Sequence, residues 1–83
     1  MQLKLTWRTE GRPDMDLLVS DDQTIQETMQ ILKETGLLAG KTAESVKYVK
    51  TLRAEQQVNV LLTYREAEIY SGDILVLENR DDK

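Results

Sequence analysis

The 83-residue sequence contains no cysteine, no histidine and only one proline. Without cysteine the chain has no disulfide and no thiolate to serve as a nucleophile or metal ligand, which fits a reducing compartment. Without histidine it lacks the commonest general base and the commonest metal ligand of proteins. We therefore predict that the chain is not an enzyme and that it has no catalytic, metal or cofactor site.

Long apolar runs are also missing. The longest is the four residues Ile74 to Leu77, whereas a helix that crosses a bilayer needs roughly 20. The opening residues MQLKLTW alternate polar and apolar side chains and lack the basic start and apolar block of a signal peptide. These observations predict a cytoplasmic protein with no membrane insertion.

The sequence has fewer basic than acidic residues. Fifteen acidic residues against eleven basic residues give a formal net charge of −4, which disfavours attraction to phosphate backbones and anionic lipid. With 40% hydrophobic and 31% charged residues, the composition is that of an ordinary folded domain. We therefore expect that nucleic acid is not a partner.

The first half of the chain carries clear periodic patterns. Leu3, Leu5 and Trp7 occupy alternate positions, the period of a strand with one buried face. Residues 9–14 combine Gly11 and Pro13 in a turn, after which residues 15–19 alternate again, so the pattern predicts an N-terminal β-hairpin.

A helix is expected next, over about 24–35. Its apolar positions recur at steps of three and four, which gathers them on one helix face. Thr24 and Glu27 have the spacing of a capping box, and Gly36 is a natural left-handed residue just beyond the helix. The apolar positions are Ile25, Thr28, Met29 and Leu32.

The second half is predicted to contain three short strands. Residues 46–53 fit either a helix or a strand, because Val46, Val49 and Leu52 have helical spacing while the segment has high strand propensity. We interpret it as a strand, followed by a turn over 54–57, a short strand at Val58 and Val60, and a segment over 61–70 with one helical turn. Residues 71–73 form a turn before a last strand over 74–78.

One helix on one face of a mixed sheet of four to five strands is an α+β arrangement. We predict a single domain over residues 1–78, followed by a polar C-terminal tail over residues 79–83.

This order of elements resembles the ubiquitin-like β-grasp fold. The stretch MQLKLTW looks like the opening strand of ubiquitin, and Thr24 and Glu27 stand where that family begins its helix. The residues YREAEI at 64–69, followed by GDILVL at 72–77, are similar to the closing pattern of the family. The likeness covers most of the chain and is weakest between residues 37 and 57.

Length and the ending I-x-x-G-D-x-L-x-L look most like the small YukD or EsaB type of bacterial ubiquitin-like protein. That resemblance implies an accessory or regulatory component of a type VII (WXG-substrate) secretion system, which acts by binding other proteins. A ubiquitin-like regulatory module of an unrelated system is the alternative.

Conjugation and sulfur transfer are disfavoured by the C-terminal residues. Modifiers and sulfur carriers of this fold end in Gly-Gly, whereas this sequence ends ENRDDK at 78–83 and has no Gly-Gly upstream. A processed sulfur carrier or conjugated modifier is therefore the less favoured alternative.

Other chemistry-bearing residues have ordinary structural explanations. The adjacent carboxylates at 21–22 and at 81–82 supply too few oxygens for the six to eight that calcium takes. Gly72 and Asp73 are expected to form a turn, because one glycine is far from a phosphate-binding loop. Trp7 shares the parity of Leu3 and Leu5 and is expected at the rim of the core, with a ligand-stacking role as the alternative.

The last strand suggests a binding surface. If Leu75 and Leu77 face the helix, as the resemblance implies, strand alternation directs Ile74 and Val76 to the opposite face. A sheet with one helix leaves that face to solvent, and ubiquitin-like domains commonly bind partners there. We therefore predict a protein-binding site formed by Ile74, Val76, Lys4 and Thr6.

We expect the third strand to add to this site in one of two registers, with either residues 49 and 51 or residues 48 and 50 facing outward. Two alternatives compete with the binding site. β-Branched residues suit any strand and scattered surface apolar residues are common, and self-association into a homo-oligomer would also cover the patch.

Overall fold

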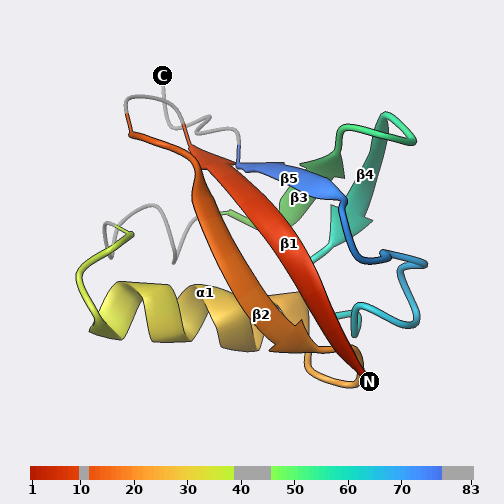
Figure 1. Ribbon diagram of the computed structural model, residues 1–83, viewed down its shortest axis with the longest axis horizontal. Coiled ribbons are helices and arrows are strands. Elements are labelled where there is room, and N and C mark those ends of the chain that lie inside the picture. Colours follow the sequence, from red (N-terminus) through yellow and green to blue (C-terminus); the bar gives the residue numbers. More distant parts are fainter. Residues whose placement is uncertain (10–11, 39–45, 78–83) are drawn as a thin grey trace.

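The computed structural model describes residues 1–9, 12–38 and 46–77. One helix packs against one face of a five-stranded mixed sheet (Figure 1). This is the predicted α+β arrangement, with the ubiquitin-like order of elements. The strands are β1 (Gln2–Thr9), β2 (Met15–Ser20), β3 (Tyr48–Thr51), β4 (Gln56–Asn59) and β5 (Ile74–Leu77), and the helix is α1 (Ile25–Glu34).

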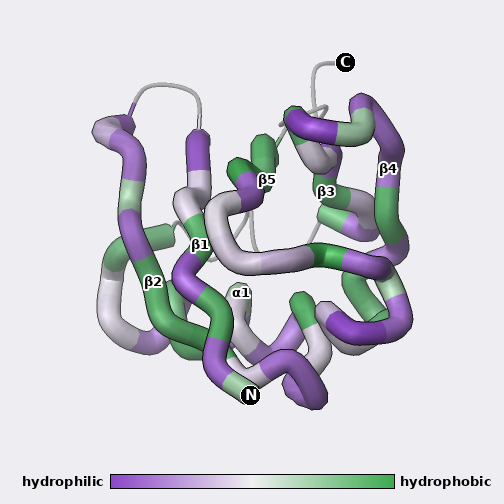
Figure 2. Tube along the Cα trace, turned by 45° about the vertical axis from the view of Figure 1, so that its right-hand side comes forward, coloured by the Kyte–Doolittle hydropathy of each residue, from purple (hydrophilic) through white to green (hydrophobic). Residues whose placement is uncertain are grey.

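The sheet order is β2-β1-β5-β3-β4, so the last strand of the chain lies at the centre. β1 pairs antiparallel with β2 and parallel with β5, and β3 pairs antiparallel with both β4 and β5. Hydrophobic and hydrophilic residues alternate along β1 in Figure 2, as expected of a strand with one face on the core.

The helix begins and ends where its sequence signals predict. The Thr24 hydroxyl accepts from the backbone N–H of Glu27, whose carboxylate accepts from the backbone N–H of Thr24. At the other end Gly36 has φ 81°. Its N–H donates to Lys33, and that of Leu37 donates to Leu32, which is a Schellman motif. α1 therefore lies within the predicted range, and Thr24 and Thr35 are its caps.

The second half differs from prediction in its boundaries. β3 is four residues long and β4 begins at Gln56, inside the segment predicted as a turn. Pairing of Thr51 with Gln56 and a left-handed Glu55 at φ 53° close the hairpin with four loop residues. Residues 61–70 form turns and include the expected single helical turn, in which the Ala67 N–H donates to the Thr63 carbonyl at 3.0 Å. The predicted tail over residues 79–83 lies outside the described residues.

The core lies between the sheet and α1. Fifteen apolar side chains are buried there, contributed by every strand, the helix and the segments that flank them. Leu38 is buried while Leu37 is 45% exposed, so only one of the two leucines after the helix packs beneath it. Within the described ranges, no helix combines the length and apolar character required to cross a membrane.

Candidate functional site: the outer face of the sheet

The side chains of β5 alternate between the two faces of the sheet. Leu75 and Leu77 are buried against the helix side, whereas Ile74 and Val76 are only partly buried. This burial pattern confirms the prediction that Leu75 and Leu77 face the helix while Ile74 and Val76 face away from it. Ile74 and Val76 consequently belong to the face opposite α1, which we call the outer face.

The pairing of the strands fixes the neighbours of these two residues. Ile74 lies level with Thr6, and Val76 lies between Arg8 of β1 and Lys50 of β3. Thr6, Ile74 and Val76 are therefore brought together as the prediction requires. Lys4, the fourth predicted residue, is two positions before Thr6 and lies at the far end of β1, where its carbonyl accepts from Gly72.

The register of β3 is decided between the two alternatives. Val49 and Thr51 are buried, so Tyr48 and Lys50 face outward. Tyr48 is 53% exposed. The end of β3 contributes a further apolar side chain, because the N–H of Leu52 donates to the carbonyl of Ile74 and Leu52 is exposed.

Sequence reasoning missed Arg8 and Leu52 as parts of this face. Arg8 follows the alternation of Lys4 and Thr6 and could have been placed from the period of β1. Leu52 could not, because its position depends on where β3 ends. We define the outer patch as the side chains that share this central region of the outer face: Thr6, Arg8, Tyr48, Lys50, Leu52, Ile74 and Val76.

The cations of the outer patch differ in their environment. The Arg8 guanidinium donates to both carboxylate oxygens of Asp14, at 3.2 and 3.0 Å. This hydrogen-bonded pair raises the pKa of Arg8 and lowers that of Asp14. Among the described residues Lys50 has no ionic partner. The outer patch therefore offers one neutralised and one available positive charge beside its apolar centre.

The turn before β5 directs the strand into the sheet. Gly72 has φ 95°, and its N–H donates to the carbonyl of Lys4 at 2.8 Å, so the predicted turn role of this position is confirmed. The carboxylate of Asp73 is 4% exposed and accepts from Arg53 Nε at 2.6 Å and from the Tyr70 N–H at 2.9 Å. Asp73 is thus a buried anchor of the turn, and its partners leave no role in anion binding.

Trp7 lies deeper than expected. It is fully buried and ranks among the largest enclosed side chains of the core, so it is not at the rim and offers no surface on which a ligand could stack. Its indole N–H has no hydrogen-bond partner within the part of the chain that the structure describes. The position is central because β1 is flanked by both β2 and β5.

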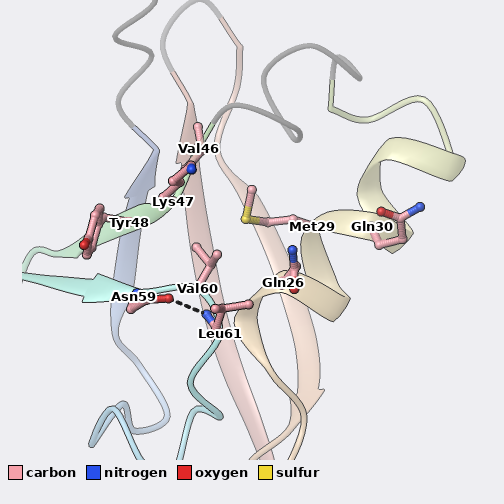
Figure 3. Close-up of a pocket in the computed structure, with 9 residues that line it drawn as sticks. All are labelled: Gln26, Met29, Gln30, Val46, Lys47, Tyr48, Asn59, Val60 and Leu61. Atoms are coloured by element: carbon pink, nitrogen blue, oxygen red, sulfur yellow. Dashed lines mark hydrogen bonds between the residues drawn. The ribbon is translucent and has the colours of Figure 1, made fainter.

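A groove of about 410 Å³ lies between α1 and the ends of β3 and β4. Figure 3 shows Met29 and Val60 between the helix and the strands, with Gln30 directed away from them. The Asn59 side chain accepts from the Leu61 N–H, so it serves the turn. Of the described residues that line the groove, Lys47 alone is charged.

No protein-family model matches the sequence, and neither does any curated protein. Solved structures do match. A protein designed de novo on the basis of ubiquitin is 26% identical, with a TM-score of 0.75 over 99% of this chain and 93% of the design. The C-terminal ubiquitin-like domain of mouse tubulin-specific chaperone e is 13% identical, with a TM-score of 0.68 over 99% and 92% of the two chains.

Ubiquitin of Caldiarchaeum subterraneum is 12% identical and matches with a TM-score of 0.64 over 99% of this chain and its own full length. At 12% and 13% identity, these two natural likenesses concern the fold alone. The sheet order, the capped helix and the shared architecture together show that this chain has the ubiquitin-like β-grasp fold.

Proposed function

We propose that this chain is a non-enzymatic, cytoplasmic protein-binding module whose binding site is the outer patch. The observation that carries the proposal is the position of Ile74 and Val76. Both side chains are partly buried and lie on the face of the sheet opposite α1, and their strand β5 is the central strand of the sheet (Figure 1). Tyr48 and Leu52 extend this apolar surface, and tyrosine is a residue type that is enriched at protein interfaces.

The charges around the patch suggest the chemistry of the partner. Lys50 is available for an ion pair and lies level with Val76, while the molecule as a whole is negative. A partner segment with apolar side chains at its centre and a carboxylate at its rim would be complementary. Rim charges mainly influence the association rate and its dependence on salt, so association with such a partner should slow as ionic strength rises.

For the biological setting we propose a type VII secretion system. Support comes from the ending I-x-x-G-D-x-L-x-L at 69–77, which together with the length of the sequence carries the resemblance to the YukD or EsaB type. A regulatory module of an unrelated system is the alternative. We further propose that the chain acts by binding and is not conjugated to other proteins.

The test is affinity capture from a lysate of the host, using the wild-type chain and Val76→Asp. Val76→Asp places a charge within an apolar contact, where an unpaired charge is costly, and we expect it to lose the partner. Gln30→Asp adds the same negative charge on the exposed side of α1 and should retain it. Both variants should keep the far-UV circular dichroism of the wild type.

The identity of the captured protein separates the parts of the proposal. Capture of a type VII secretion component by the wild type and Gln30→Asp, but not by Val76→Asp, would support both the site and the setting. Equal capture by Val76→Asp would rule out the outer patch as the site. A partner from another system would contradict the secretion role, and a covalent adduct found by intact-mass spectrometry would contradict action by binding alone.

A further inference from the structure

β2 is an edge strand whose free side runs along the margin of the sheet (Figure 1). It is six residues long and pairs with β1 over its whole length. The described residues provide no strand on its other side. An edge of this length presents a row of backbone groups to which another chain can add.

The hydrogen-bond pattern identifies which backbone groups are free. The Asp21 N–H donates to the Met1 carbonyl, and antiparallel ladders alternate between bonded and non-bonded pairs. The odd-numbered residues of β2 therefore bond to β1, and the N–H and C=O groups of Asp16 and Leu18 point away from the sheet. No hydrogen bond to these four groups occurs within the described ranges.

Three protections common on natural edge strands are missing from β2, and its one charged side chain is that of Asp16. Natural edges are often blocked by lysine, by proline or by a bulge, and β2 has none of these, since its residues are MDLLVS in continuous register with β1. Leu18 is 66% exposed on this strand. The strand is therefore both apolar and open to addition.

Two carboxylates lie on either side of Leu18. Among the described residues Asp16 has no ionic partner and accepts only the Thr6 hydroxyl. Asp22 accepts the Ser20 hydroxyl and interacts electrostatically with Arg65, without forming an ion pair. By contrast, Asp14 is paired with Arg8, and Asp21 is paired with Arg65 and the N-terminal amine. The free edge thus combines an exposed apolar side chain with the unpaired carboxylate of Asp16 and the partly compensated carboxylate of Asp22.

We propose that the β2 edge binds an extended basic segment of a partner protein, which adds to the sheet as a sixth strand. Its backbone bonds to Asp16 and Leu18, an apolar side chain lies beside Leu18, and cationic side chains lie opposite Asp16 and next to Asp22. Strand addition of this kind draws affinity from backbone hydrogen bonds and specificity from alternate side chains. The proposal does not depend on the outer patch.

A second copy of the chain is a poorer occupant of the same edge. If two β2 strands paired antiparallel with Leu18 opposite Leu18, Asp16 of each copy would lie opposite Ser20 of the other and would gain no cationic partner. Each copy also carries a formal net charge of −4, which opposes the approach of the two molecules.

The probe is a capped peptide with the centre Lys-Val-Val-Val-Lys, titrated into the ¹⁵N-labelled full chain and followed by NMR. We expect the amide resonances of Asp16, Leu18 and their β2 neighbours to shift, and the Asp16 and Leu18 amides to become protected from hydrogen exchange. Since the charges are exposed, binding should weaken with added salt. Val76→Asp should bind the peptide as the wild type does.

Two matched changes test the role of charge. Asp16→Lys should weaken binding about tenfold, because an attraction becomes a repulsion at an exposed site. Glu34→Lys makes the same charge change at the exposed end of α1 and should leave the affinity nearly unchanged. A peptide with glutamate in place of lysine should not bind; if it binds equally well, the charge complementarity is wrong.

Two further results would overturn strand addition itself. A peptide N-methylated at the amides that face β2 loses those donors, so equal binding of this peptide would exclude backbone pairing. Unchanged Asp16 and Leu18 amides at millimolar peptide would exclude the edge as the docking site. If the same amides instead shift with protein concentration and sedimentation shows a dimer, the occupant is a second copy and the proposed partner is wrong.

Discussion

At the scale of single residues, Tyr64 stands out because its polar group is enclosed in the core. Its hydroxyl donates to the Thr28 hydroxyl at 2.6 Å, linking the segment after β4 to α1. Burial raises the pKa of Tyr64 to about 12, and the hydrogen bond with Thr28 acts in the opposite direction. Folding therefore favours the neutral phenol, and the cause is the cost of burying a charge.

The raised pKa of Tyr64 predicts a loss of stability in alkali. Its contribution is fully present below the ordinary pKa of 10 and is lost as pH rises toward about 12, by about 2 to 3 kcal/mol. Tyr64→Phe should lower the free energy of unfolding at neutral pH by about 1 kcal/mol and flatten the alkaline fall.

Urea unfolding between pH 7 and 11 measures both effects on stability. Tyr70→Phe is the control, because Tyr70 is 56% exposed and its loss should leave the alkaline fall in place. If the free energy of unfolding of Tyr64→Phe decreases with pH as steeply as that of the wild type, titration of another group is responsible.

At the scale of elements, α1 depends on how its first turn is closed. Helix starts leave backbone N–H groups without partners, and the capping box of Thr24 and Glu27 satisfies two of them. Thr24 also forms a β-bridge to Thr63, and the Gln26 N–H donates to the Val60 carbonyl. The cap therefore fixes the helix start against the segment after β4.

Loss of the capping hydrogen bond should lower the free energy of unfolding by a measurable amount while the protein remains folded. Thr24→Ala loses the hydroxyl that accepts from Glu27 and should lower the free energy of unfolding by about 1 kcal/mol. Thr24→Ser keeps a hydroxyl and should lose much less. If urea unfolding shows that Thr24→Ala and Thr24→Ser lower the free energy of unfolding equally, the threonine methyl group, and not the capping hydrogen bond, stabilises this helix start.

At the scale of the whole molecule, the last strand closes the structure. β5 lies between β1 and β3, so residues from the start, middle and end of the chain meet across three adjacent strands. Leu75 and Leu77 are buried with the side chains of both neighbours. Such pairings are distant in sequence, and their formation carries the entropic cost of closing long loops.

Truncation tests this central role together with the predicted domain boundary. Removal of residues 74–83 deletes β5 and should abolish the cooperative urea transition and the native circular dichroism. Removal of residues 79–83 alone should leave the free energy of unfolding close to that of the full chain. A stable fold without β5, or a large loss from the shorter truncation, would contradict the boundary at residue 78.

The sequence by itself determined the elements whose signals are local. Alternation predicted β1 and β2, and the spacing of apolar residues and the T-x-x-E cap predicted α1, whereas the buried side chains of β5 were implied by the resemblance of the L-x-L ending to the family's closing strand. These signals work because a strand repeats every two residues and a helix every 3.6, so a few neighbouring residues suffice to set a direction.

Only the tertiary structure decided what depends on pairing between distant segments. The outward direction of Lys50, the exposure of Leu52 and the central burial of Trp7 all follow from the order and register of strands. The free edge of β2 beside Leu18 follows from the same order. A shift of one residue in register exchanges the two faces of a strand. Local periodicity therefore predicted the elements, while the surfaces proposed for binding were decided by long-range strand pairing.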